Sequence, residues 1–141
     1  HMHKYVAPLL LSMIPTLAHA GVLSVDTRCF SNAKNTINVE FRAYTDSEIG
    51  WIGAQVKYRQ SDEFIPLAFK GTETLREVPD RPWEFEHTWL EILDGKIAGQ
   101  YKMVSQGAVI YAFTYTSKRS GKVVDISEQS YIDEDGACTW N

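Results

Sequence analysis

The sequence predicts an all-β protein: an antiparallel β-sandwich of the fibronectin-III or immunoglobulin-like kind, with about seven to nine strands and one disulfide. Three observations predict it. Apolar and polar residues alternate with a period of two over most of the chain after residue 20. Turn residues recur about every ten residues, and no stretch in this part combines a helical period with capping residues. A small barrel would show the same pattern, but the chain length fits a sandwich best.

The N-terminal residues are predicted to be a leader and not part of the fold. His1 is interpreted as a cloning residue in front of the initiator methionine. Lys4, an apolar run too short to span a bilayer, and the A-x-A ending at residues 18–20 are the three parts of a secretory signal peptide. We therefore expect residues 1–20 to be a cloning residue plus signal peptide, and residues 21–141 to form a single β-sandwich domain.

The charge of the chain excludes several classes of partner. Its 14 Lys and Arg residues and 18 Asp and Glu residues give a formal net charge of −4, and loss of Lys4 with the leader makes it −5. An acidic chain without a basic stretch lacks the electrostatic surface that nucleic acids require. It lacks a polybasic segment for anionic membranes as well, so we expect no membrane insertion after leader cleavage.

The two cysteines, Cys29 and Cys138, lie near the two ends of the predicted domain. An exported chain with an even number of cysteines favours a disulfide. On the chain-entropy model, a disulfide that closes a loop of roughly 100 residues stabilises the folded state by at most ~4.7 kcal/mol. Two distant thiols do not make a metal site. Immunoglobulin domains pack a central tryptophan against a disulfide that joins their two sheets. The tryptophans and cysteines of this chain are not placed for that pattern, so a fibronectin-III domain is the closer analogy for the predicted fold.

The first half of the domain reads as four or more short strands. Pro66 cannot donate to a β-ladder, so its segment is predicted to be an edge strand. An edge of this kind permits strand exchange and a strand-swapped homodimer. A further short strand is expected at residues 72–78. The four principal predicted strands are residues 23–29, 37–43, 52–58 and 65–69.

The second half continues the pattern. Residues 83–93 form a strand whose alternation is lost near its end, and Asp94-Gly95 predicts a tight hairpin turn. The return strand is residues 96–104. Residues 108–116 are apolar at both parities, which is typical of a central strand. A strand at residues 123–132 and a last segment that carries Cys138 and Trp140 complete the chain.

His87 and the glutamates around it are the strongest candidates for chemistry, and we interpret them as structural. Successive side chains of a strand point to opposite faces, so Glu84 and Glu86 do not share the face of His87. Glu91 shares it only if no bulge intervenes. His87 instead belongs to a row of aromatic residues: Trp83, Phe85 and Trp89. His87 is the one histidine after residue 20, so the predicted domain has no pair of histidines for a metal site. The acidic run at residues 133–136 lacks the later ligands of a calcium loop.

Partner-binding residues are predicted at two places. Trp51 has the opposite parity to the apolar residues Ile52, Ala54 and Val56, so it is expected to face outward, where an exposed aromatic ring can anchor a partner. The alternative is that Trp51 covers a second sheet. Lys118, Arg119 and Lys122 form a basic hairpin tip, which is either a solvated turn or a contact for an acidic partner surface.

These observations predict a small exported bacterial protein that binds another protein and catalyses nothing, with no cofactor and no metal. The first hypothesis is a secreted factor, found in the periplasm or outside the cell, that engages a host surface protein or another extracellular protein. The second is a periplasmic inhibitor or immunity protein that neutralises a basic cell-wall hydrolase, because an acidic domain would be steered to it. A surface-fibre subunit, a carbohydrate-binding domain and an enzyme acting on wall polymers are further alternatives.

Overall fold

A computed structural model describes residues 4, 8, 21–129 and 132–140 of the chain. The predicted leader therefore lies almost entirely outside the described residues. Among the described residues, no helix is long and apolar enough to cross a membrane.

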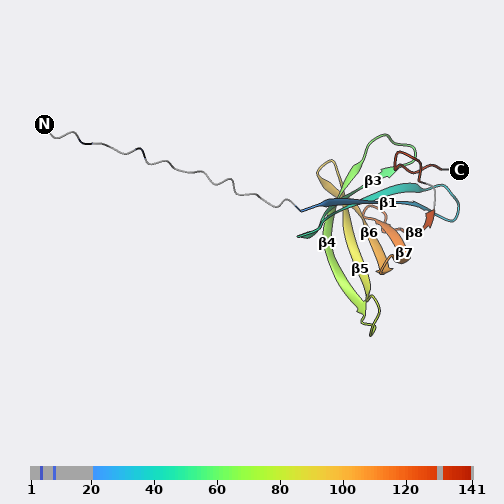
Figure 1. Cartoon of the computed structure of the whole chain (residues 1–141). Helices are drawn as coiled ribbons and strands as arrows, with labels where there is room; N and C mark the ends of the chain where they lie inside the picture. Colours follow the sequence, from blue (N-terminus) through green and yellow to red (C-terminus); the bar gives the residue numbers. More distant parts are fainter. Residues whose placement is uncertain (1–3, 5–7, 9–20, 130–131, 141) are drawn as a thin grey trace.

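Eight antiparallel strands follow one another around a closed barrel (Figure 1). Each strand pairs with the next, and the last pairs with the first. The strands are β1 (Leu23–Ser31), β2 (Asn38–Asp46), β3 (Gly50–Tyr58), β4 (Ile65–Arg76), β5 (Glu84–Leu93), β6 (Lys96–Gln106), β7 (Val109–Ser117) and β8 (Val123–Gln129). The predicted all-β antiparallel class and strand number are confirmed, whereas the predicted sandwich is wrong.

Closure depends on a short contact between β1 and β8. Among the described residues, three pairs join them, with Phe30 opposite Glu128 at the centre. The local alternation of apolar and polar residues is the same in a sandwich and in a barrel. The difference lies in this one long-range pairing, which local periodicity does not reveal.

The barrel interior is filled by aromatic side chains. Phe41 lies at its centre, and its ring meets the rings of Trp89 and Phe113 edge-on, at centroid distances of 5.9 and 5.4 Å. Phe30 stacks on Phe113 at 4.3 Å, and Tyr101 packs beside them. All five side chains are buried. Small barrels of eight strands are wide enough for side chains to fill them, and this one is packed in that way.

The predicted turn at Asp94-Gly95 is confirmed. Both residues have positive φ angles, 51° and 73°, which is the geometry of the two-residue turns that join twisted antiparallel strands. The expectation of a central strand at residues 108–116 is confirmed in that β7 pairs with β6 on one side and β8 on the other. Its two faces are not both buried: a register shift at Tyr111 leaves Val109 and Tyr111 53% and 61% exposed, although Phe113, of the same sequence parity, is buried.

Pro66 does not lie on a sheet edge. It is part of β4, which pairs with β3 on one side and β5 on the other. The pairing with β3 covers only three residue pairs, and Pro66 itself is exposed. The separate strand predicted at 72–78 is the continuation of β4 past a register shift at Gly71. Beyond Leu67, β4 is paired with β5 alone, so the strand-swapped homodimer stays a prediction.

The β4–β5 hairpin is longer than the rest of the barrel. β3 pairs with β4 only up to Leu67, whereas β4 and β5 stay paired as far as Arg76 and Glu84. The hairpin therefore projects beyond one end of the barrel (Figure 1). Its inward-facing residues lose the opposite wall that would cover them inside the barrel.

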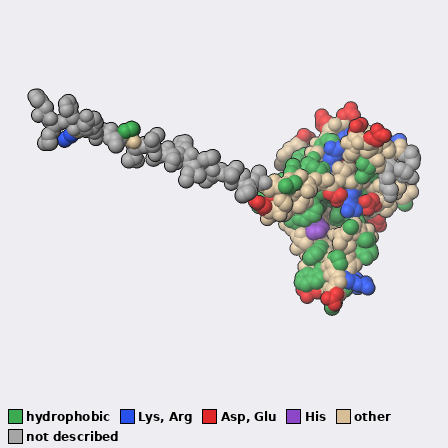
Figure 2. Space-filling model, in the orientation of Figure 1, with side chains coloured by type: hydrophobic (Ala, Val, Ile, Leu, Met, Phe, Trp, Pro, Cys, Tyr) green, Lys and Arg blue, Asp and Glu red, His purple; other side chains and the backbone are tan. Residues whose placement is uncertain are grey.

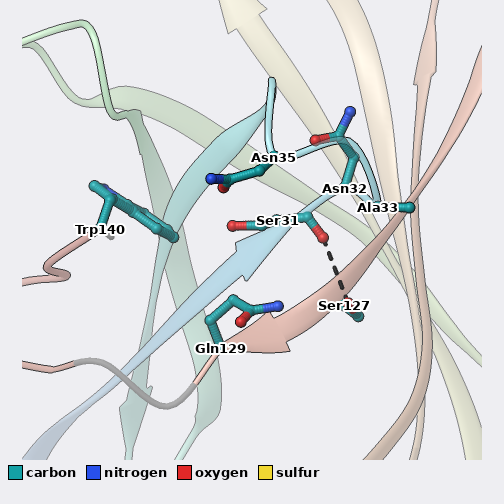
Figure 3. Close-up of a pocket in the computed structure, with 7 residues that line it drawn as sticks. All are labelled: Ser31, Asn32, Ala33, Asn35, Ser127, Gln129 and Trp140. Atoms are coloured by element: carbon teal, nitrogen blue, oxygen red, sulfur yellow. Dashed lines mark hydrogen bonds between the residues drawn. The ribbon is translucent and has the colours of Figure 1, made fainter.

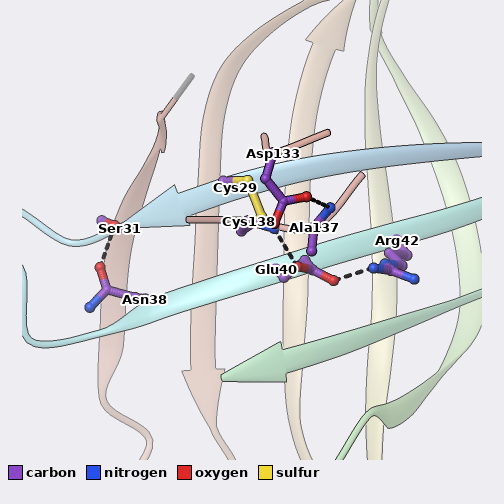
Figure 4. Close-up of a disulfide and its surroundings, with 8 residues drawn as sticks. All are labelled: Cys29, Ser31, Asn38, Glu40, Arg42, Asp133, Ala137 and Cys138. Carbon is purple, nitrogen blue, oxygen red and sulfur yellow. Dashed lines mark hydrogen bonds and ion pairs between the residues drawn. A yellow bond between two sulfur atoms is a disulfide. The ribbon is translucent and has the colours of Figure 1, made fainter. Parts of the chain in front are cut away.

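The predicted disulfide between Cys29 and Cys138 is confirmed, with an S–S distance of 2.01 Å (Figure 4). It ties the C-terminal segment to the outer surface of β1 and β2. The backbone N–H of Cys138 donates to Glu40 Oε1 at 2.6 Å, and the other carboxylate oxygen of Glu40 pairs with Arg42 at 2.8 Å. Glu40 is thus a buried but satisfied anion. The disulfide is compatible with an oxidising compartment.

Candidate functional site

A row of partly exposed aromatic rings lies at the end of the barrel where the β4–β5 hairpin projects. We call it the aromatic face; it comprises Trp51, Phe69, Trp83, Phe85 and His87. Trp51, Phe69 and Trp83 are 39%, 38% and 42% exposed. Hydrophobic side chains gather on this part of the surface, on the same side as the histidine (Figure 2). Monomeric proteins seldom leave neighbouring aromatic rings uncovered without a binding role.

The register of β5 builds most of this face. Phe85, His87 and Trp89 alternate toward the inside of the barrel, as the sequence pattern predicts. Trp89 lies deep enough to be buried, with 1% exposure, whereas Phe85 and His87 are only partly covered. The aromatic face is therefore the uncovered continuation of the barrel core along the projecting hairpin.

Trp51 reaches this face through a β-bulge. Tyr44 of β2 pairs with Gly53 and Thr45 pairs with Trp51, so Ile52 is the extra residue. A bulge of this kind reverses the parity of the residues beyond it. The indole of Trp51 consequently turns inward, against Trp89 at 5.7 Å and His87 at 5.8 Å. The prediction that Trp51 points away from the core is wrong in direction, although the ring is partly exposed as expected.

His87 is held among rings and not among acids. Its Nδ1 lies 2.8 Å from Thr72 Oγ1, and its ring contacts those of Phe69 and Phe85. Burial lowers the pKa of His87 below its ordinary value. The imidazole is therefore mainly neutral at pH 7, which suits a residue inside an apolar surface.

The neighbouring glutamates lie on the other face of the hairpin, as predicted. Glu84 pairs with Arg76 at 3.4 Å and Glu86 with Lys102 at 3.7 Å. Neither converges on His87. General acid–base catalysis requires titratable groups that meet at one reacting atom. His87 and these two glutamates lie on opposite faces of the hairpin and do not meet in this way.

Glu91 belongs to a buried cluster that the sequence analysis missed. Its carboxylate accepts hydrogen bonds from Tyr58 at 2.7 Å and Tyr115 at 2.9 Å, and the Tyr58 hydroxyl also bonds to that of Tyr101. Burial raises the pKa of all three tyrosines well above the ordinary value. The register shift between β5 and β6 comes after Glu91, between Glu91 and Ile92. Glu91 therefore keeps the parity of His87 and Trp89 and points into the barrel. The loss of alternation at residues 90–93 was the signal in the sequence for this irregularity.

Glu91 and His87 do not form a joint site. Both point inward from β5, but Trp89 stands between them in the same row and is buried. The Glu91 cluster is closed within the core, whereas His87 lies on the aromatic face. A buried carboxylate whose hydrogen bonds are satisfied by tyrosines is a structural network.

The seam between β1 and β8 carries an ion cluster that the sequence analysis also missed. Arg28 Nε pairs with Asp26 at 2.9 Å, and its Nη1 pairs with Glu128 at 3.2 Å. The same Nη1 donates to the carbonyl of Ala108 in the β6–β7 turn at 3.4 Å. Arg28 thereby links β1, β8 and the β6–β7 turn beside the ladder between β1 and β8.

The predicted basic tip lies at the opposite end of the barrel from the aromatic face. Lys118, Arg119 and Lys122 are exposed in the β7–β8 turn. The turn itself is held by Gly121 N–H donating to the Ser117 carbonyl at 2.8 Å. In an antiparallel meander, this turn lies at the other end from the β2–β3 turn beside Trp51. The structure therefore does not bring the two predicted contact regions together.

The acidic run at residues 133–136 is a turn, as interpreted from the sequence. Asp133 Oδ1 accepts from the backbone N–H groups of Asp135 and Ala137, both at 2.9 Å, and Gly136 has a φ of 78°. The Asp133 side chain is therefore used for the turn. Over the described part of the chain, no group of three or more His, Cys, Asp or Glu side chains is placed to hold a metal ion.

Comparisons with known proteins supply no relative: no protein-family model matches the chain, and no curated protein or solved structure shows significant similarity to it.

Proposed function

We propose that this chain is an exported bacterial protein-binding module, without catalytic activity, that engages a partner protein through the aromatic face. The observation that carries the proposal is the contact of partly exposed rings with a buried core ring: Trp51 and Phe69 both pack against Trp89. Binding hot spots are enriched in tryptophan and depend on anchors that are already held in place.

Charge around the face indicates the kind of partner. The two turns beside it, residues 47–49 and 77–83, carry Glu48, Glu77 and Asp80 against a single basic residue, Arg81. All four side chains are exposed. A complementary partner would present an apolar protrusion surrounded by basic residues, and the acidic rim would increase its association rate.

Two partner classes meet this description. The first is a basic region of a host surface protein or another extracellular protein, which would make the chain a secreted factor. The second is a cationic cell-wall hydrolase, which would make it a periplasmic inhibitor or immunity protein. The acidic rim favours the second class, because enzymes that act on anionic wall polymers benefit from positive charge.

One experiment tests the proposal against both classes. Oxidised protein lacking residues 1–20 is assayed for inhibition of purified cationic wall hydrolases and for direct binding to extracellular proteins captured from host-cell membranes and then purified. Each partner that binds is measured again with Trp51→Ala and with the control Val123→Ala, which removes an exposed apolar side chain at the start of β8, at the other end of the barrel.

The proposal predicts that Trp51→Ala weakens binding at least tenfold, or about 1.4 kcal/mol, while Val123→Ala does not. Inhibition of a hydrolase supports the immunity hypothesis, and binding without inhibition supports the secreted-factor hypothesis. Equal affinities of the two variants for every purified partner would contradict a role for the aromatic face.

A further inference from the structure

A polar pocket of about 300 Å³ lies on the outer surface of the barrel, beside the β1–β2 turn (Figure 3). Its walls come from four segments: the end of β1, the β1–β2 turn, the end of β8 and the C-terminal segment. The volume is at the small end of the range of roughly 300–1,000 Å³ that is typical of ligand sites. The pocket is separate from the aromatic face, since the β1–β2 turn and the β2–β3 turn lie at opposite ends of β2.

Two parts of the wall are fixed by hydrogen bonds within the protein. Ser31 Oγ donates to Asn38 Oδ1 at 2.6 Å. The Asn32 side chain donates to Thr36 Oγ1 and accepts from the backbone N–H groups of Thr36 and Ile37. These bonds hold the β1–β2 turn in one conformation, so this side of the pocket is formed before any ligand arrives.

Trp140 forms the opposite wall, and the disulfide holds it there. Cys138, two residues before it, is bonded to Cys29 and donates its backbone N–H to Glu40. The Trp140 ring is partly buried and stands across the pocket from the β1–β2 turn (Figure 3). The disulfide restrains the segment that carries this ring, so its apolar face is presented to the pocket at a reduced entropic cost.

Two polar groups of the pocket have no partner in the described part of the structure. Neither the Gln129 side-chain amide nor the Trp140 indole N–H makes a hydrogen bond there. Gln129 comes from β8 and lines the pocket together with Ser127. The amide can both donate and accept, and the indole N–H can donate.

None of the side chains that line the pocket is charged: they are Ser31, Asn32, Ala33, Asn35, Ser127, Gln129 and Trp140. An ionised ligand would therefore meet no opposite charge, and a wholly apolar ligand would leave amides and hydroxyls unpaired. A ligand with one apolar face and many hydroxyl groups satisfies both walls. A pyranose ring has this chemistry, because its C–H groups cover an aromatic ring while its hydroxyls bind amides.

We propose that this pocket binds one pyranose unit of a neutral glycan, stacked on Trp140 and hydrogen-bonded to Gln129. The site does not depend on the proposed function of the aromatic face. It would give the module a second, separate attachment point, toward a glycan and not a protein.

The test is a titration of oxidised, 15N-labelled protein followed by NMR. Neutral oligosaccharides of glucose, galactose and N-acetylglucosamine are the probes, and sialyllactose and a heparin oligosaccharide are the anionic comparators. The indole N–H of Trp140 and the side-chain amide of Gln129 are the reporters. Trp140→Ala, Gln129→Ala and the control Tyr111→Ala, which removes an exposed ring of β7 outside the pocket, are titrated in parallel, after their thermal unfolding has shown that each variant is folded.

The proposal predicts saturable shifts of both reporters with at least one neutral oligosaccharide. It also predicts that Trp140→Ala lowers that affinity about tenfold or more, that Gln129→Ala lowers it, and that Tyr111→Ala leaves it unchanged. Three results would overturn it: no neutral probe that shifts the reporters, binding that survives the loss of Trp140, or a response to the anionic probes alone.

Discussion

The ring of Trp51 meets the ring of Trp89 edge-on, with the planes at 90° and the centroids 5.7 Å apart. Trp89 is buried and Trp51 is partly exposed, so the pair joins the barrel core to the surface. This contact fixes the position of Trp51, and a fixed ring loses little conformational freedom when a partner covers it. The aromatic face is in this sense an extension of the core.

The two tryptophans of this pair are expected to contribute very differently to stability. Trp89→Ala leaves a cavity in the core and should lower the free energy of unfolding by about 3–5 kcal/mol. Trp51→Ala removes a partly solvated ring from the end of the barrel and should cost about 1 kcal/mol. Urea denaturation followed by circular dichroism measures both. A larger loss for Trp51→Ala than for Trp89→Ala would show that the core is wrongly assigned.

The disulfide is expected to be a main source of stability. Replacing Cys29 and Cys138 by serine opens a long loop and releases the segment that buries Glu40, so the free energy of unfolding should fall by about 2–5 kcal/mol. Guanidinium denaturation of oxidised protein and of the double variant measures the difference. Adding a reductant should shift the unfolding midpoint of the wild type and leave that of the double variant unchanged. An insensitive wild type would contradict this prediction.

The buried tyrosines predict a loss of stability at alkaline pH. Burial raises the pKa of Tyr58 and Tyr101 in the folded state, whereas tyrosines of the unfolded chain titrate near pH 10. The folded state therefore binds more protons above pH 10, so stability is full below that pH and falls by about 1.4 kcal/mol per pH unit for each tyrosine above it.

Denaturation curves at several pH values between about 9 and 11.5 test this expectation. Tyr101→Phe should reduce the slope of stability against pH, and Tyr111→Phe, which changes an exposed ring, should not. A slope that is the same in all three proteins would mean that Tyr101 ionises equally in the folded and unfolded states.

His87 predicts a smaller effect at acidic pH. Burial lowers its pKa in the folded state, and the unfolded histidine titrates near 6.5. As pH falls through about 6.5, the unfolded state takes up the proton first, so the wild type should lose stability that His87→Phe retains. NMR titration of the imidazole gives the pKa directly. A folded-state pKa at or above 6.5 would contradict the described surroundings of this residue.

Local features of the fold could be predicted from the sequence, but its closure could not. Alternation placed the strands, and Asp94-Gly95 located a two-residue hairpin turn, because both signals depend on neighbouring residues. The barrel depends on the pairing of Phe30 with Glu128 across almost the whole chain. No local pattern encodes that pairing, although the confirmed link between the two cysteines was a sign that the chain ends meet.

The candidate site shows the same limit. The alternation of β5 correctly placed His87 with the aromatic row and its glutamate neighbours on the other face. The side on which Trp51 lies depends on the bulge at Ile52, and one inserted residue reverses every parity argument beyond it. The three tyrosines around Glu91 come from separate strands, so only the barrel registers bring them together.

Hydrogen exchange of the complex with a purified partner tests the central claim most directly, that binding occurs at the aromatic face. We expect slower amide exchange at residues 50–53 and 83–88 when the partner is bound, with the β7–β8 turn at residues 117–122 unchanged. Protection at the β7–β8 turn with none on the projecting hairpin would contradict it.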